Sequence, residues 1–326
     1  MSSRRPVSTE LHARVEGLGA IPQHQSELRG EDDPQQKSPG PDTIVCGLRP
    51  TVIGVVLVAS SFSFLLGYDI GVMSGAKRLV ARDMQLSTVE IELLVGSLNI
   101  VSGIGGLFSG SLADVIGRRK TAALACALTV VGSLLMAFAH SYDALLTGRI
   151  VTGLGVGSCF QVAPLYIAEV APKDVRGRLV SSFDLFINVG ILVGYLTGWA
   201  LQPANLPPTD VLEVDTGGLS NWRWMLGLGA VPPAIILVAL AYTPESPRFL
   251  VSVGRLRQAH MVLGRIYTHA EAEATFTLLQ EDARTSRPLP LTVGLRRVLC
   301  PSDAAKRALL VAGMGVAFCQ QATGVE

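Results

Sequence analysis

Charged residues are scarce in this sequence. Asp, Glu, Lys and Arg make up 16% of its 326 residues, whereas about a quarter of the residues of soluble domains are charged. Hydrophobic residues make up 49%, so the composition favours a protein that crosses a lipid bilayer several times. The formal net charge is only +1, and no cluster of basic residues resembles a nucleic-acid surface. Nucleic acid is therefore not an expected partner.

Patterns that bind metals or support catalysis are missing as well. No CxxC or HxxxH pair occurs, so no metal site is expected. The five cysteines lie far apart in the chain, which argues against a disulfide framework. No Ser-His-Asp, metal-ligand or phosphate-loop constellation is present, so we expect neither an enzyme nor a cofactor.

The first 50 residues lack a continuous apolar stretch. They are rich in Pro, Gln, Ser, Asp and Arg, as in "RGEDDPQQKSPGPD". This composition predicts a disordered cytoplasmic tail over 1–50 and not a cleaved signal peptide.

The rest of the chain is organised by long apolar runs, each able to span about 30 Å of hydrocarbon as a helix. The six complete runs lie at 51–76, 91–113, 121–140, 144–168, 179–200 and 223–242. They predict an all-α membrane protein with a six-helix amino-terminal transmembrane bundle over 51–242. Residues 243–306 alternate apolar and basic residues and predict cytoplasmic linker helices. A seventh transmembrane helix over 307–326 is cut at Glu326, so we expect the chain to be a fragment.

Basic residues set the expected orientation. Ten Lys and Arg residues fall between Arg248 and Arg307, and the run 118–120 is entirely basic. The segments on the other side carry three basic residues within 77–82 and none in 141–143 or 201–221. This asymmetry predicts a cytoplasmic amino terminus. We expect the plasma membrane rather than a vacuolar or other internal membrane.

Glycines recur at spacings typical of close helix packing. Gly190, Gly194 and Gly198 are four residues apart, and Gly106 and Gly110 repeat the spacing. "GLGVG" at 153–157 superficially resembles a dinucleotide loop. No preceding strand or later ribose-binding acid accompanies it, so helix packing is the favoured interpretation.

Three ionisable residues lie well inside the predicted spans: Asp69, Arg149 and Asp184. Each costs about 2.5–3.5 kcal/mol at a helix centre, so a partner or a water-filled cavity is expected. Asp69 is about 17 residues into an outward-running helix, about 25 Å above the inner face, and Arg149 is about 9 Å below the outer face. Both fall in the outer third of the bilayer, which predicts that they pair.

The predicted pair suggests a mechanism. A nearby arginine favours the ionised form of a buried carboxylate, while desolvation opposes it. If the two separate, Asp69 takes up a proton, so the pair could couple protonation to a helix movement. The alternative is a static ion pair that orients two helices.

Other polar residues in the spans suit recognition of hydroxyl groups. Asp184 lies one helical turn from Asn188, so both can face one cavity, where a carboxylate accepts and an amide donates and accepts. Alternatively, they bond a neighbouring helix. Gln320 and Gln321 add amides on the seventh helix, and because adjacent helical residues diverge by about 100°, one of them is expected to point inward.

Several motifs carry a family resemblance over about residues 51–326. "GSLADVIGRRK" (110–120) resembles the signature loop of the major facilitator superfamily. "GRIVTGLGVG" (148–157), "PESPRFL" (244–250) and "QQATG" (320–324) resemble the sugar porter family. "LLGYDIGVMSGA" and "NWRWMLGLGAVPP" are similar to its plant-type polyol and monosaccharide proton symporters.

The resemblance implies twelve helices in two halves, with a sugar site between them and alternating access. It implies that Asp69 is the proton-coupling acid with Arg149 as its partner, and that Gln320 and Gln321 bind sugar. It also implies a cytoplasmic gate of exposed ion pairs, each worth about 0–1 kcal/mol. The gate residues are Asp114, Arg118, Arg119, Glu169, Arg176, Glu245 and Arg248.

The expected function is proton-coupled symport of a monosaccharide or polyol by alternating access, with the solute, protons and the lipid bilayer as partners. An acid at Asp184 is more typical of polyol carriers, since hexose carriers commonly have Gln there. The alternatives are an uncoupled sugar facilitator, or a sugar-binding sensor that does not translocate if the chain is natively truncated.

Overall fold

The computed structural model describes residues 49–172, 175–202 and 220–285, together with Arg307, Ala308, Val311, Ala312 and Gly315. Within these residues the secondary structure is α-helical, as the composition and apolar runs predict. The predicted tail up to residue 48, the acidic stretch 203–219, Gln320 and Gln321 lie outside the described residues.

Six helical segments of the described chain are long and apolar enough to cross a membrane, which confirms the predicted number of spans. They are α2 (Pro50–Asp83), α3 (Thr88–Ile116), α4 (Arg118–Ala137), α5 (Tyr142–Val170), α6 (Arg176–Ala200), and a span formed by α7 (Asn221–Leu228) with α8 (Val231–Leu240). The boundary of the first span differs from the prediction, because α2 continues past 76 to Asp83. Leu79 and Val80 are buried there, so packing extends the helix beyond the apolar run.

Side-chain caps and a glycine fix the helix ends. Ser87 and Glu90 form a capping box at the start of α3, with each side chain bonded to the backbone of the other. A single residue, Gly117, joins α3 to α4 with φ of 99°, a conformation that costs glycine little. The tight turn brings the two helices back beside each other.

The sixth span is broken in its middle. Gly229 and Ala230 separate α7 from α8, and Pro232 and Pro233 follow in the first turn of α8. Proline has no backbone N–H to donate and its ring clashes with the preceding turn, which accounts for the break in the helix at this point. The break places Gly229 beside Tyr68 and Ser133.

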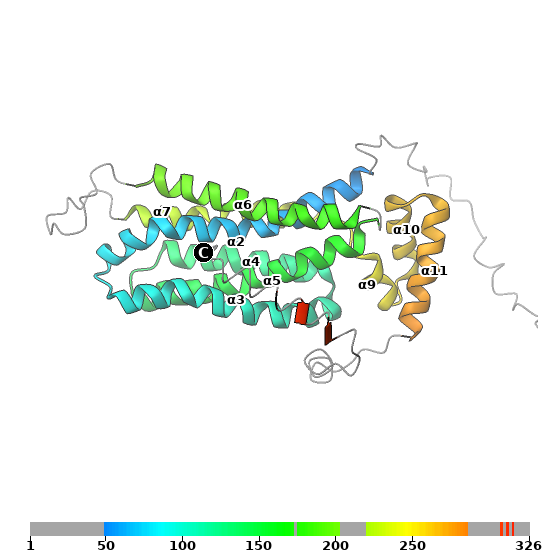
Figure 1. The fold of residues 1–326 in the computed structure, drawn as a ribbon, viewed down its shortest axis with the longest axis horizontal. Helices are drawn as coiled ribbons and strands as arrows, with labels where there is room; N and C mark the ends of the chain where they lie inside the picture. Colours follow the sequence, from blue (N-terminus) through cyan, green and yellow to red (C-terminus); the bar gives the residue numbers. More distant parts are fainter. Residues whose placement is uncertain are drawn as a thin grey trace, which may run out of the picture. The chain divides into compact units, whose positions relative to one another are not determined.

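The most extensive contact among the described helices joins α2 and α6, which run side by side in Figure 1. A Cβ atom added to Gly190 would overlap the Phe64 carbonyl, and one added to Gly194 would lie 2.6 Å from the Tyr68 carbonyl oxygen. Gly67 and Gly71 face α6 equally closely from the other side. The predicted role of Gly190 and Gly194 in helix packing is confirmed.

The prediction for Gly106 and Gly110 is wrong. Among the described residues, a Cβ on Gly110 would meet nothing within 4 Å, and one on Gly106 would meet only ordinary contacts. The close approach on α3 is at Gly105, where a Cβ would lie 2.7 Å from the Leu154 carbonyl oxygen of α5. Spacing identified the helix correctly but could not identify which of its faces packs.

The "GLGVG" segment lies inside α5, as the helix-packing interpretation predicts. Gly153 and Gly157 face α3 at Leu98, Val101 and Ser102. Gly155 faces α4, where a Cβ would lie 2.7 Å from the Ala125 carbonyl oxygen. These glycines allow α5 to pack closely between α3 and α4.

Three short helices follow the bundle within the predicted linker segment: α9 (Pro247–Ser252), α10 (Leu256–Ile266) and α11 (His269–Thr285). One face of α10 is buried, including Ala259, Leu263 and Ile266. At the start of α11, hydrogen bonds from the Thr268 hydroxyl and backbone hold the pKa of the Glu271 carboxyl below its ordinary value. Residues 286–306 lie outside the described part of this segment.

Candidate functional site

Asp69 and Arg149 form an ion pair inside the bundle. Nη1 of Arg149 donates to Oδ1 of Asp69 at 2.6 Å. Asp69 lies near the middle of α2 and is 7% exposed, and Arg149 lies in α5 and is 2% exposed. The two residues placed at one depth by their positions in the sequence are therefore in direct contact. When one partner of a buried pair is removed, the charge left behind typically costs about 3–5 kcal/mol.

The surroundings of the pair come from several helices. Asp69 lies where α2 passes between two clusters of buried apolar side chains, since Leu65 belongs to one cluster and Tyr68 and Val72 belong to the other. The Tyr68 hydroxyl donates to the Met225 carbonyl of α7 at 3.0 Å, which holds α2 against the sixth span. The pair is thus enclosed by apolar packing.

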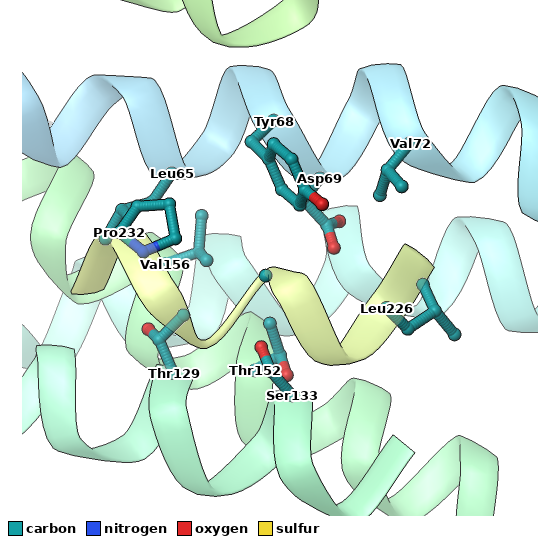
Figure 2. Close-up of a pocket in the computed structure, with 11 residues that line it drawn as sticks. Leu65, Tyr68, Asp69, Val72, Thr129, Ser133, Thr152, Val156, Leu226 and Pro232 are labelled. Carbon is teal, nitrogen blue, oxygen red and sulfur yellow. The ribbon is translucent and has the colours of Figure 1, made fainter. Parts of the chain in front are cut away.

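A small cavity adjoins Asp69, with its polar side chains coming from three helices. Asp69 of α2, Thr152 of α5, and Thr129 and Ser133 of α4 line it together with apolar residues (Figure 2). The cavity offers ≈ 10 Å³ to the centre of a water molecule. In the described structure, Oδ2 of Asp69, Nε of Arg149 and Oγ1 of Thr152 are buried without a hydrogen-bond partner. The ion pair is therefore made through a single hydrogen bond, with polar atoms left on both sides.

A second charged cluster, here called the gate cluster, surrounds the turn between α3 and α4. Nη2 of Arg118 lies 2.8 Å from Oδ1 of Asp114 and 2.8 Å from Oε1 of Glu169. The Ser246 hydroxyl donates to Oε2 of Glu169 at 2.5 Å. Glu245 accepts hydrogen bonds from the backbone N–H groups of Arg119 and Ser246. These bonds tie α4, α5 and the start of α9 together.

The gate cluster differs from the predicted exposed network in its burial. The side chains of Arg118 and Glu169 are 7% and 5% exposed, whereas that of Asp114 is 68% exposed. Arg176 donates instead to the Ala171 carbonyl, and neither Arg176 nor Arg248 forms an ion pair within the described residues. Arg248 is exposed on α9. The gate cluster therefore contains fewer ion-paired residues than expected, and its central pair is buried.

Asp184 and Asn188 share a face of α6, as their spacing predicts. Both are exposed, and Nδ2 of Asn188 donates to the backbone carbonyl of Asp184 at 2.9 Å. Neither residue lines the cavity beside Asp69. The structure thus brings these two together but separates them from the buried ion pair.

A known protein family matches most of this chain. Residues 55–326 match the family model described as "Sugar (and other) transporter". The chain belongs to the sugar transporter family. It is an all-α, multi-pass membrane protein of the major facilitator superfamily, as its motifs indicate.

Relatives of this chain include polyol transporters. It is 40% identical over 286 residues to polyol transporter 5 of Arabidopsis thaliana, covering 83% of this chain and 50% of that protein. It is 34% identical over 280 residues to a human proton myo-inositol cotransporter, covering 85% of this chain and 41% of that protein. The chain spans about half the length of the curated relatives it matches.

Solved structures show the same fold. A proton:xylose symporter bound to 6-bromo-6-deoxy-D-glucose superimposes with a TM-score of 0.67 at 26% identity, over 76% of this chain and 55% of that chain. A partially occluded, inward-open xylose transporter from E. coli gives a TM-score of 0.65 at 25% identity, over 76% and 61% of the two chains. The predicted resemblance to sugar porters is confirmed.

Sequence reasoning missed several contacts in this chain. Asp83 accepts from Nε1 of Trp222 at 2.8 Å, and the Arg223 guanidinium lies 4.5 Å from the Trp222 ring. Ser246 was also missed, although its place before Pro247 at a helix start is a signal for a cap.

Two cysteines that are distant in the sequence lie close together in the structure. Cys126 and Cys159 lie far apart in the sequence, yet their Sγ atoms are 3.9 Å apart, because α4 and α5 pack against each other. Both are free thiols buried in the bundle.

The gate cluster yields a prediction about stability, because Arg118 pairs with two carboxylates, one buried and one exposed. Replacing Glu169 with Ala leaves the buried Arg118 without its buried partner, so we expect a loss of about 2–3 kcal/mol in the free energy of unfolding. Asp114→Ala removes the exposed partner of the same guanidinium and should cost about 0–1 kcal/mol. Unfolding of the purified protein in mixed micelles measures both, and equal losses would contradict the assignment of Glu169 as the principal partner.

Proposed function

We propose that this chain provides the amino-terminal part of a proton-coupled carrier for a polyol or monosaccharide. The observation that carries the proposal is the buried Asp69–Arg149 ion pair. A carboxylate in an apolar bundle stays charged only while a cation compensates it. Proton uptake and separation from Arg149 are therefore linked, which is the requirement for coupling a proton to a conformational change.

The names of the relatives support the choice of solute and of coupling ion. They include polyol transporters, a proton myo-inositol cotransporter and a proton:xylose symporter. Asp184 and Asn188 offer one acceptor-rich face on α6 that is exposed in the described chain. We propose that this face, with Gln320 and Gln321, binds solute hydroxyl groups between the two halves of the carrier.

The gate cluster would act in the outward-facing state of the transport cycle. We place the amino terminus and this cluster on the cytoplasmic side of the plasma membrane, following the distribution of Lys and Arg. Arg118, Glu169 and Ser246 would hold the bundle closed at that side while the solute site faces outward. Opening inward requires the cluster to break or to move as one body.

Proton coupling supplies enough free energy to concentrate the solute. Moving one charge through 100 mV is worth about 2.3 kcal/mol, which supports roughly a 50-fold concentration ratio. A facilitator without coupling would reach no such ratio.

The function is tested directly by adding a polyol to cells that express the carrier, or to liposomes in which the carrier has a single orientation. We expect the external medium to become alkaline as solute enters, and a protonophore to abolish accumulation without blocking exchange. Uptake without alkalinisation would instead assign an uncoupled facilitator. Solute binding without counterflow would assign a sensor, and either result would overturn the proposed function.

A further inference from the structure

Thr152 differs from two other buried threonines of the bundle, Thr121 and Thr129. Thr121 donates to the Gly117 carbonyl at 2.8 Å and Thr129 to the Ala125 carbonyl at 3.0 Å, each one helical turn earlier. Oγ1 of Thr152 is buried and has no hydrogen-bond partner in the described structure, although the residue is only 2% exposed. Because a buried hydroxyl normally finds a partner, this atom points to a ligand in the cavity that it lines.

Asp69 leaves a second polar atom at the same cavity. Its Oδ1 is bonded to Arg149, but its Oδ2 is buried without a partner in the described residues. In Figure 2 Asp69 approaches the cavity from α2, while Thr152 and Ser133 lie across from it on α5 and α4. Two residues that each carry a buried oxygen without a hydrogen-bond partner thus line one small space.

The size and charge of this space select its occupant. The ≈ 10 Å³ open to the centre of a water molecule matches the lower limit for one water, which needs about 10–15 Å³ and two to four polar partners. Arg149 already balances the charge of Asp69, so a neutral molecule fits better than a cation. A polyol is far too large for the site.

We propose that one water molecule binds in this cavity between Oδ2 of Asp69 and Oγ1 of Thr152, and that Thr152 is a positioning residue for proton uptake by Asp69. The water donates one hydrogen to the carboxylate and accepts the hydroxyl hydrogen of Thr152. This bond stabilises the ionised carboxylate more than the neutral acid, because a charged acceptor binds a donor more strongly. The proposal rests on the proposed role of Asp69 in proton coupling.

Within the described residues, few other titratable groups face Asp69. Arg149 of α5 is its ion-pair partner, and the Tyr68 hydroxyl of α2 is directed to the Met225 carbonyl. The residues that α4, α7 and α8 contribute to the cavity are Thr129, Ser133, Leu226, Gly229 and Pro232, which carry no ionisable side chain. On α6, Asp184 and Tyr195 are exposed. A change at Thr152 therefore acts on Asp69 without altering another charge.

The test compares Thr152→Val, which removes the hydroxyl, with Thr152→Ser, which retains it. In the carrier reconstituted in liposomes, we expect Thr152→Val to move the pH of half-maximal proton-driven uptake upward by about one unit, a tenfold change in proton affinity. Thr152→Ser should match the wild type. If Thr152→Val does not fold, Thr152→Ala takes its place against the same serine control. An unchanged pH profile in the variant without the hydroxyl overturns the proposal.

An independent readout separates this inference from the proposed function. The infrared band of the protonated Asp69 carboxyl, assigned by its disappearance in Asp69→Asn, can be followed against pH without any transport. We expect the band to appear at higher pH in Thr152→Val than in Thr152→Ser, and coincident titrations would refute the water bridge. The proposed function fails separately, if Asp69→Asn still accumulates solute.

Discussion

Asp69→Asn is expected to abolish proton-driven accumulation of solute while downhill exchange continues. Asparagine keeps the shape of the side chain and can still accept a hydrogen bond from Arg149, but it carries no charge and takes up no proton. The variant therefore resembles a permanently protonated carrier. Accumulation and counterflow of a labelled polyol in liposomes under an imposed pH gradient measure the two activities separately.

Exchange by the variant also controls for folding. Arg149 is left buried beside a neutral amide, so some loss of stability is expected, and persisting exchange shows that the protein has folded. Asp143→Asn is the matched control, since Asp143 is exposed in the first turn of α5 and far along the helix from the cavity. Full accumulation by Asp69→Asn would instead assign a static ion pair that only orients two helices.

Gly194→Val is expected to remove most of the folded protein. A Cβ at this position would lie 2.6 Å from the Tyr68 carbonyl oxygen and 2.7 Å from the Val72 nitrogen, both backbone atoms of α2. Backbone cannot rotate away as a side chain can, so α2 and α6 must separate along the interface that they share. We expect the free energy of unfolding to fall by more than about 3 kcal/mol, beyond the usual cost of overpacking a core.

The matched control lies in α2. A Cβ on Gly54 would meet nothing within 4 Å, so Gly54→Val should change stability by less than about 0.5 kcal/mol. The yield of monodisperse protein and its melting temperature in detergent compare the two variants. Equal behaviour would show that the packing of α2 against α6 contributes little.

The buried ion pair could be predicted from the sequence because two independent constraints apply to the same two residues. Asp69 and Arg149 are charges in apolar runs, which hydrocarbon penalises strongly, and their positions along oppositely directed helices give similar depths. Depth follows from counting residues. It does not specify which helices are neighbours, so the contact with Arg149 through one oxygen and the cavity at the other needed the structure.

The burial of the gate cluster shows the opposite case. Arg118 and Asp114 are near neighbours in the sequence, which suggests an exposed surface pair, and Asp114 is indeed exposed. Glu169 reaches the same guanidinium from a distant part of the chain, and Ser246, more distant still, donates a hydrogen bond to Glu169. Glu169 was assigned to the gate only through the resemblance to a family. Nothing in the sequence indicated that Arg176 and Arg248 would form no ion pair within the described residues.

The sequence by itself determined the class of the protein, the number of spans before residue 243 and the family, because apolar length and short motifs are local properties. Only the tertiary structure decided which glycine of α3 packs, that Cys126 meets Cys159, and that Thr152 shares a cavity with Asp69. A helix that is apolar on all sides has little preferred face in its sequence. Its rotation about its own axis is fixed only by contact with its neighbours, and that rotation places every side chain of the site.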